Sequence, residues 1–212
     1  MSADEERGSK PNKRQPLEFW FDFSSPYGYL AATQIDEVAA DYGRSVIWRP
    51  FLLGAIFKLT GALPLTEVPL KGAYARMDFN RYARLLGVPL TLPAIFPVSG
   101  LIPSRAFYWL EEAYPAKAKL FAERIFEGLF VENQDVANLE AVVSLLKSLG
   151  IAESEATDSL ASAAVKAKVK SINDEAIAKG IFGSPFILLD DQAFWGMDRL
   201  WMVEEWLETG GW

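Results

Sequence analysis

The segment LEFWFDFSSPYG, residues 17–28, constrains the fold more than any other part of this chain. Its first seven residues are apolar and rich in aromatic side chains, a pattern typical of a buried β-strand. From Tyr27 onward, apolar residues recur every three or four positions, as on one face of a helix. Pro26 suits the first helical position, which leaves Ser25 as the N-cap. A second apolar run, SVIWRP at 45–50, completes a parallel β-α-β unit.

The rest of the chain is predicted to be helical until a hairpin near its end. Residues 51–70, rich in Gly, Pro and Leu, are expected to form a loop, and Leu120 and Ile177 are placed on apolar helix faces. The predicted helices are 27–42, 72–86, 104–113 with Ser104 as its N-cap, 115–130, 138–149, 153–160, 162–179 and 198–207. The predicted hairpin strands are 185–191 and 193–196.

This order predicts an α/β protein with a thioredoxin-like fold and a large all-helical insertion. A β-α-β unit followed by a hairpin and a helix is the thioredoxin arrangement. The expected divisions are a disordered N-terminal arm at 1–16, a thioredoxin-like domain at 17–53 and 173–212, and an inserted helical domain at 54–172. A doubly wound α/β domain stays open as the alternative.

The composition excludes several kinds of chemistry, because the chain has no cysteine and no histidine. It therefore contains no disulfide, no Cys-x-x-Cys redox pair, no Ser-His-Asp triad and no imidazole metal ligand. A carboxylate-only metal site stays open, although no D-x-D-x-D-G loop is present. An enzyme of this composition would act through Ser, Tyr, Lys, Asp or Glu, or through a bound cofactor.

Charge and hydropathy restrict the partners and the location. A net charge of −7 without a basic stripe argues against nucleic acid and against an anionic membrane surface. The chain contains no run of about 18 apolar residues, so no transmembrane helix is predicted. The first 16 residues are charged and lack the apolar core of a secretory signal, so a cytoplasmic location is expected.

Two roles for Ser25 follow from its place before the helix. As an N-cap, its hydroxyl would stabilise the helix by about 1 kcal/mol. The same hydroxyl, beside the free N–H groups of the first turn, could instead stabilise an anion such as a thiolate. Since the chain has no thiol, that thiol would arrive on a cofactor. A nucleophilic Ser25 is disfavoured, because there is no histidine and no G-x-S-x-G motif.

Four segments together resemble one family. FDFSSPYGYLA, WRPFLLGAIFKLTG, GIFGSPFILL and FWGMDRL occur between Leu17 and Leu207 in the order found in 2-hydroxychromene-2-carboxylate isomerases and their relatives, the kappa-class glutathione transferases. The resemblance implies a thioredoxin domain with a helical insertion, related to DsbA oxidoreductases. It places Ser25-Pro26-Tyr27-Gly28 where those relatives carry Cys-x-x-Cys.

The resemblance also implies a glutathione site. Ser25 matches the serine that hydrogen-bonds the glutathione sulfur. Ser184 precedes Pro185, which matches the cis-proline of thioredoxin-like folds, and the Ser184 backbone would pair with the cysteinyl unit. Asp198 matches the aspartate that takes the γ-glutamyl ammonium, and Lys71 a lysine at the glycyl end. Each assignment has an alternative. Pro185 could be a turn proline that begins a strand, Asp198 the N-cap of the last helix, and Lys71 a solvated surface lysine.

Two positions depart from the family pattern. Met197 stands where relatives often carry Ser or Gln, so only its backbone N–H could bind the cofactor. Ala62 stands where some relatives carry Asn. Both departures leave open another thiol or a changed substrate.

The activity implied by the resemblance is a glutathione-dependent isomerisation. It interconverts 2-hydroxychromene-2-carboxylate and trans-o-hydroxybenzylidenepyruvate by reversible thiolate addition, as in naphthalene degradation. Phe51, Leu52 and Trp195 are candidates for the wall around an aromatic substrate, with a plain core role as the alternative. A kappa-like transferase and a non-catalytic thiol- or peptide-binding module stay open, and the family suggests a homodimer.

Overall fold

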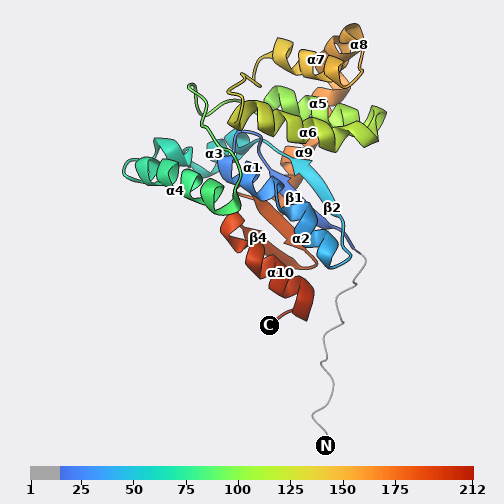
Figure 1. The fold of residues 1–212 in the computed structure, drawn as a ribbon. Helices are drawn as coiled ribbons and strands as arrows, with labels where there is room; N and C mark the ends of the chain where they lie inside the picture. Colours follow the sequence, from blue (N-terminus) through green and yellow to red (C-terminus); the bar gives the residue numbers. More distant parts are fainter. Residues whose placement is uncertain (1–14) are drawn as a thin grey trace, which may run out of the picture.

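The computed structural model describes residues 15–212 (Figure 1). The predicted disordered arm at 1–16 therefore lies, apart from its last two residues, outside the described residues. Within 15–212, no helix is both long and apolar enough to cross a membrane.

The centre of the fold is a four-stranded sheet with the order β2-β1-β3-β4. Strand β2 is parallel to β1, whereas β3 is antiparallel to both β1 and β4. This mixed sheet confirms the thioredoxin-like arrangement, and the doubly wound alternative is wrong because its strands would run parallel. The strands are β1 (Leu17–Phe21), β2 (Val46–Pro50), β3 (Phe186–Leu189) and β4 (Gln192–Trp195).

Helices surround this sheet, and α5, α6, α7 and α8 gather on the side away from α10 and the C-terminus (Figure 1). The proposed division at residue 172 falls inside α9, and the domain boundaries stay a prediction. The helices are α1 (Pro26–Ala32), α2 (Ile35–Asp41), α3 (Leu53–Thr60), α4 (Lys71–Leu86), α5 (Leu101–Ala113), α6 (Pro115–Phe130), α7 (Leu139–Ser148), α8 (Glu153–Ala161), α9 (Ala163–Ala178) and α10 (Leu200–Thr209), with 3₁₀ turns η1 (Leu65–Glu67) and η2 (Met197–Arg199).

The predicted helix at 27–42 is in fact two helices, α1 and α2. The Thr33 hydroxyl donates to the Leu30 carbonyl at 2.8 Å, and the Gln34 N–H bonds the Ala31 carbonyl at 3.0 Å. These short-range bonds replace the regular helical pattern at the junction. The apolar periodicity continues across the break, so it did not reveal the change.

Two other local predictions are wrong. Residues 53–60, expected as loop, form α3, which ends at Gly61 with a left-handed φ of 72°. Ser104 is not an N-cap, because α5 begins three residues earlier, at Leu101. Pro103 fits there, since the first N–H groups of a helix have no intrahelical partner.

The core is continuous between the sheet and the helices. Phe21 and Phe23, at the end of β1, lie 5.3 and 5.4 Å from the ring of Phe126 in α6. Leu120 and Ile177, expected on apolar faces, are instead 42% and 40% exposed. The aromatic contacts pack the carboxyl end of β1, shortly before α1, against α6.

Candidate functional site

Ser25 lies at the start of α1 and makes two hydrogen bonds through one hydroxyl group. Its Oγ accepts the Gly28 N–H at 3.0 Å, which confirms the N-cap. The same hydroxyl donates to the backbone carbonyl of Ser184 at 3.0 Å. Only 7% of Ser25 is exposed. The cap and the contact with the β3 loop are therefore properties of the same oxygen.

The loop before β3 brings Ser184 against Ser25. The Ser184–Pro185 peptide bond is cis, as the family resemblance implies. The Ser184 Oγ accepts the Asp22 N–H at 2.9 Å. The side chain and the carbonyl of Ser184 thus both contact the segment that joins β1 to α1.

Asp22 is a buried carboxylate beneath this segment, and the sequence reasoning missed it. Its Oδ1 accepts the Ser24 N–H and its Oδ2 the Leu53 N–H, both at 2.7 Å. Burial raises the pKa of Asp22, because the charged form loses its hydration, and the two backbone N–H groups oppose this shift. The second bond caps the N-terminus of α3, where Leu52 supplies no side-chain cap. Its position at the end of a buried strand was the signal that could have revealed it.

Gly28 leaves little space around the two serines. A Cβ at this position would lie 2.9 Å from the Ser184 Oγ and 3.1 Å from the Ser25 Cβ. The position that would hold the second cysteine of a redox motif is thus filled by the neighbouring serine side chains.

Asp198 lies in η2, and its carboxylate is accessible. Its side chain is 46% exposed and pairs with the Arg199 guanidinium at 2.6 Å. The alternative role as N-cap of α10 is wrong, because Arg199 occupies that position and makes no side-chain cap bond. The neighbouring Met197 turns its side chain into the core and is 6% exposed.

Lys71 and Ala62 lie on the segment between β2 and α5. Lys71 is the first residue of α4 and is exposed. Ala62 is exposed in the turn after α3, where its N–H approaches the Thr60 hydroxyl at 3.4 Å. Neither side chain makes a hydrogen bond to Ser25, so their parts in a ligand site stay proposals.

The three candidates for an aromatic wall have different surroundings. Phe51 is fully buried and packs edge-on against Trp20, with ring centroids 6.3 Å apart, so its role is that of the core. Leu52 is partly buried. Trp195 is 55% exposed and packs 4.8 Å from the ring of Phe182, one residue from Gly183. Trp195 is therefore the candidate that a substrate can reach.

Tyr27 links α1 to α4, a contact that the sequence reasoning did not predict. Its hydroxyl donates to the Asp78 Oδ2 at 2.6 Å. Burial and the neighbouring Asp78 carboxylate raise the pKa of Tyr27. Tyr27 is therefore a neutral donor.

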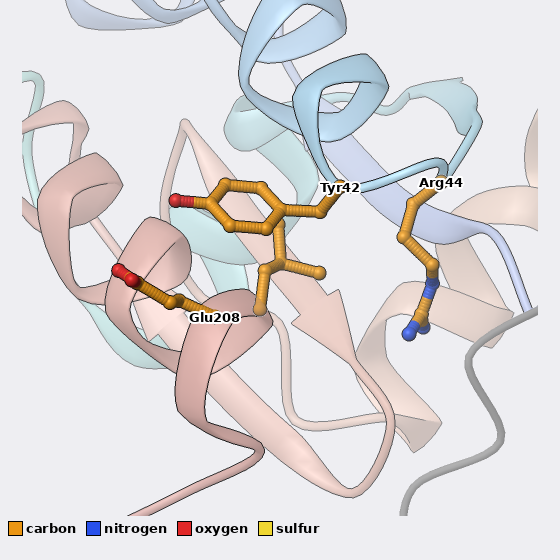
Figure 2. Close-up of a pocket in the computed structure, with 4 residues that line it drawn as sticks. Tyr42, Arg44 and Glu208 are labelled. Carbon is orange, nitrogen blue, oxygen red and sulfur yellow. The ribbon is translucent and has the colours of Figure 1, made fainter.

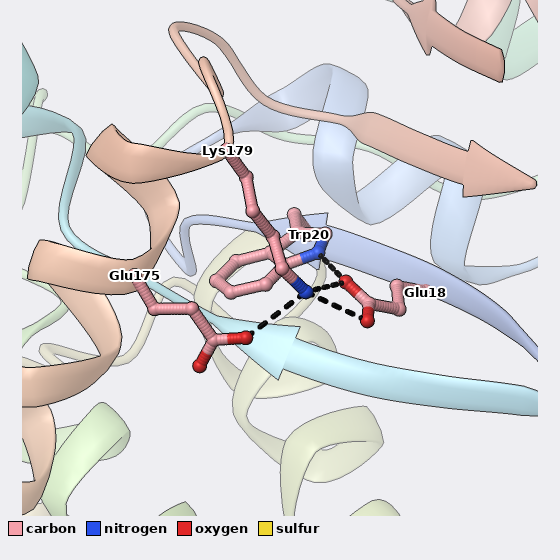
Figure 3. A network of polar contacts seen from close by, with 4 residues as sticks. All are labelled: Glu18, Trp20, Glu175 and Lys179. Atoms are coloured by element: carbon pink, nitrogen blue, oxygen red, sulfur yellow. Dashed lines mark hydrogen bonds and ion pairs between the residues drawn. The ribbon is translucent and has the colours of Figure 1, made fainter. Parts of the chain in front are cut away.

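A polar network ties β1 to the end of α9 (Figure 3). The Lys179 ammonium donates to both carboxylate oxygens of Glu18, at 2.8 and 2.7 Å, and lies 3.0 Å from the Glu175 carboxylate. The Trp20 indole N–H donates to Glu18 at 2.7 Å. Burial alone would raise the pKa of Glu18, but the bonds from Lys179 and Trp20 outweigh it and lower the pKa.

Two surface hollows do not involve the residues predicted for the site. One of about 170 Å³ is lined by Tyr42, Arg44, Leu207 and Glu208 (Figure 2). Arg44 is already paired there with Asp190 at 2.8 Å. The other, of about 540 Å³, lies beside Trp109 and Val165. Across residues 15–212, no group of three or more acidic side chains is placed to hold a metal ion.

The mixed sheet, the cis-proline loop and the capped turn facing it define a thioredoxin-like protein of the DsbA type. The family model described as a DSBA-like thioredoxin domain matches residues 16–208, and the chain belongs to this family.

Its similarity extends to particular relatives. The 2-hydroxychromene-2-carboxylate isomerase of Pseudomonas putida is 30% identical over 192 residues, which cover 89% of this chain and 92% of that protein. The glutathione S-transferase kappa 2 of Caenorhabditis elegans is 27% identical and covers 93% of both chains. A solved 2-hydroxychromene-2-carboxylate isomerase superposes with a TM-score of 0.80 at 28% identity, covering 91% of this chain and 94% of that one.

Proposed function

We propose that this chain is a glutathione-dependent isomerase that interconverts 2-hydroxychromene-2-carboxylate and trans-o-hydroxybenzylidenepyruvate. The observation that carries this proposal is the buried Ser25 hydroxyl, held between the Gly28 N–H and the Ser184 carbonyl. By the family resemblance, this hydroxyl corresponds to a cysteine of disulfide-exchanging relatives. The relatives named as isomerases support the reaction class.

The residues that the family resemblance assigns to the site carry groups that fit a thiol tripeptide. Ser25 offers a hydroxyl donor, the Ser184 backbone a carbonyl acceptor, Asp198 an accessible carboxylate and Lys71 an exposed ammonium. We assign these four residues, with the Pro185 turn and the Met197 backbone, to the glutathione site. Bound glutathione would supply the thiolate that adds reversibly to the conjugated alkene and so allows rotation about that bond.

Ser25 would stabilise the thiolate by changing its hydrogen-bond partner. Its hydrogen is directed at the Ser184 carbonyl at 3.0 Å. Donation to a sulfur anion requires the hydroxyl to rotate, while its lone pair can stay on the Gly28 N–H. The released Ser184 carbonyl is then an acceptor for a ligand N–H. One neutral hydrogen bond is thereby exchanged for a stronger, charge-assisted one. Because α1 has only seven residues, we assign this stabilisation to the hydroxyl rather than to the helix dipole.

Asp198 would have to exchange partners as well. Its carboxylate is paired with Arg199 at 2.6 Å, and both side chains are nearly half exposed. An exposed pair of this kind contributes little, about 0–1 kcal/mol, so a ligand ammonium can compete for the carboxylate.

Glutathione transfer to electrophiles is the second candidate function. It is favoured by the relative named glutathione S-transferase kappa 2, which matches 93% of this chain. Met197 and Ala62, which depart from the family pattern, also keep a non-catalytic thiol-binding module as an alternative. We further propose a cytoplasmic homodimer that acts in aromatic hydrocarbon catabolism.

The decisive experiment compares Ser25→Ala with Ser162→Ala. Ser162 is the N-cap of α9, where its Oγ accepts the Val165 N–H at 3.3 Å. Both variants lose a serine cap and should be destabilised by about 1 kcal/mol. Chromene-carboxylate turnover with glutathione should fall at least tenfold in Ser25→Ala, as the loss of a hydrogen bond to a charged group predicts, and should persist in Ser162→Ala.

Three other results would decide between the functions. Turnover that does not need glutathione would refute the cofactor proposal. Equal activity in the two variants would show that Ser25 acts only as the N-cap of α1. Stoichiometric consumption of glutathione would identify a transferase, because an isomerase releases the thiol unchanged.

A further inference from the structure

The side chain of Tyr27 joins α1, which begins next to the proposed sulfur-binding Ser25, to α4, which carries the proposed glycyl-end residue Lys71. Its hydroxyl donates to the Asp78 Oδ2 at 2.6 Å, and Arg81 binds the other carboxylate oxygen at 2.5 Å. Asp78 is only 8% exposed. One carboxylate oxygen of Asp78 therefore accepts from Tyr27 of α1, and the other accepts from Arg81 of its own helix.

Helix α4 also packs against the hydrophobic core through Tyr82, Ala83 and Leu86. Besides Asp78, four residues of α4 are buried: Gly72, Ala75, Phe79 and Ala83. The opposite face is open, with Tyr74, Met77 and Leu85 being 57%, 52% and 76% exposed. Three of these four positions are small, and the Tyr27–Asp78 bond adds a directional polar contact between α4 and α1 to the apolar packing.

The ring of Tyr27 reinforces its hydroxyl. It packs edge-on against Phe79, with ring centroids 4.6 Å apart, and lies 6.3 Å from the ring of Tyr82. A Tyr27→Phe substitution would keep these ring contacts and remove only the bond to Asp78. Tyr27→Phe thus separates the effect of the hydrogen bond on the position of α4 from the effect of the aromatic packing.

Lys71 and Asp78 share a face of α4. They are seven residues apart, nearly two helical turns, and so lie about 10 Å apart along the axis on the same side. Tyr27 follows Ser25 by two residues in α1. The Tyr27–Asp78 bond therefore fixes the helix of Lys71 relative to the helix of Ser25.

We propose that the Tyr27–Asp78 hydrogen bond sets the span between Ser25 and Lys71, and thereby selects thiols that carry a carboxylate beyond the cysteinyl unit. The inference rests on the proposed function, since it concerns the cysteinyl sulfur and the glycyl end of the same ligand. Tyr27 and Asp78 are positioning residues, because they act through α4 and not through contact with the ligand.

Binding constants for two thiols test this selection. Glutathione and γ-glutamylcysteine differ only by the glycine, so their affinity ratio isolates the Lys71 end. We expect Tyr27→Phe to weaken glutathione binding about fivefold to tenfold and to change γ-glutamylcysteine binding less than twofold. The effect on glutathione is smaller than direct loss of a hydrogen bond to a charged group, because Tyr27 acts through α4. Calorimetric titration of both thiols gives the ratio.

Tyr29→Phe is the matched control. Tyr29 is in the same helix, and its hydroxyl donates to the Pro89 carbonyl at 2.9 Å rather than to α4. Its removal should leave the ratio of the two affinities unchanged. An equal loss for both thiols in Tyr27→Phe, or no loss for either, would overturn the proposal.

Hydrogen exchange measured without ligand separates this inference from the proposed function. The amides of residues 71–76 should exchange severalfold faster in Tyr27→Phe than in Tyr29→Phe, because the first turns of α4 lose their hydrogen bond to α1. If wild-type protein binds neither thiol, the proposed glutathione site fails, and exchange alone decides the positioning role. Unchanged exchange in Tyr27→Phe would refute that role.

Discussion

At the residue scale, one hydroxyl group serves both stability and the proposed chemistry. Ser25 caps α1 by accepting from Gly28 and reaches the β3 loop by donating to Ser184. A hydroxyl can do both because it carries one hydrogen and two lone pairs. The capping role and the ligand role therefore do not exclude each other.

Gly28→Ala tests how closely the two serines must approach. Alanine in a helix is ordinarily more stable than glycine by about 0.5–1 kcal/mol. At position 28 its Cβ would lie 2.9 Å from the Ser184 Oγ, so one of the serines must move. We expect glutathione binding to weaken at least tenfold, measured by calorimetry, with little or no gain in the unfolding free energy.

Gly54→Ala in α3 is the control for helix propensity. A Cβ at position 54 would have no neighbouring atom within 4 Å. This variant should gain about 0.5–1 kcal/mol of stability and keep its affinity for the thiol. Unchanged binding in Gly28→Ala would show that the spacing of the serines is not critical.

At the element scale, a charged group fastens α9 to β1. Glu18 receives bonds from Lys179 and from the Trp20 indole, and its side chain is 24% exposed (Figure 3). These bonds lower the pKa of Glu18 from 4.5 despite its partial burial. The contact thus stabilises the folded state in a manner that depends on pH.

Glu18→Gln should reveal that pH dependence. The folded-state pKa lies below the unfolded value of 4.5, so the stabilisation is fully present above pH 4.5 and is lost as the pH falls through the lowered value. We expect a loss of about 1–2 kcal/mol at pH 7, allowing for partial screening. The difference from wild type should shrink in urea titrations below pH 4.5.

Glu153→Gln provides the comparison. Bonding to Lys147 also lowers the pKa of Glu153, but that side chain is 64% exposed. Its effect at pH 7 should be clearly smaller than that of Glu18→Gln. Equal effects would indicate that the β1–α9 network adds nothing beyond an ordinary surface ion pair.

At the scale of the whole molecule, the sheet and the helices share one apolar core. Phe126 in α6 lies against Phe21 and Phe23 of the β1 end and against Tyr29 of α1. Removing this ring would open a cavity that borders both parts. The proposed inserted domain is therefore expected to unfold together with the thioredoxin-like domain.

Phe126→Ala should lower the unfolding free energy by about 3–5 kcal/mol. Urea transitions followed by far-ultraviolet circular dichroism and by tryptophan fluorescence should coincide in wild type and variant. Leu120→Ala, in the same helix but at a position that is 42% exposed, should have a much smaller effect. Two separate transitions in wild type would contradict the shared core.

The local features of this chain could be predicted from the sequence. The strand from Leu17, the cap at Ser25 and the helix start at Pro115 each depend on a few adjacent residues. The missed helix α3 and the displaced start of α5 show the limit of such rules. Proline and glycine there suggested loops, whereas the carboxylate of Asp22, just after β1, caps α3 across 31 residues of chain.

The sequence by itself determined the order of the strands and of most helices, the serine before the first helix, and the absence of any thiol or imidazole. Only the tertiary structure decided that Ser25 meets Ser184, 159 residues away, and that Tyr27 meets Asp78. Periodicity and caps report energies between near neighbours in the chain. Contacts between distant residues depend instead on how whole elements pack, because the sheet and the shared core bring them to within hydrogen-bonding distance.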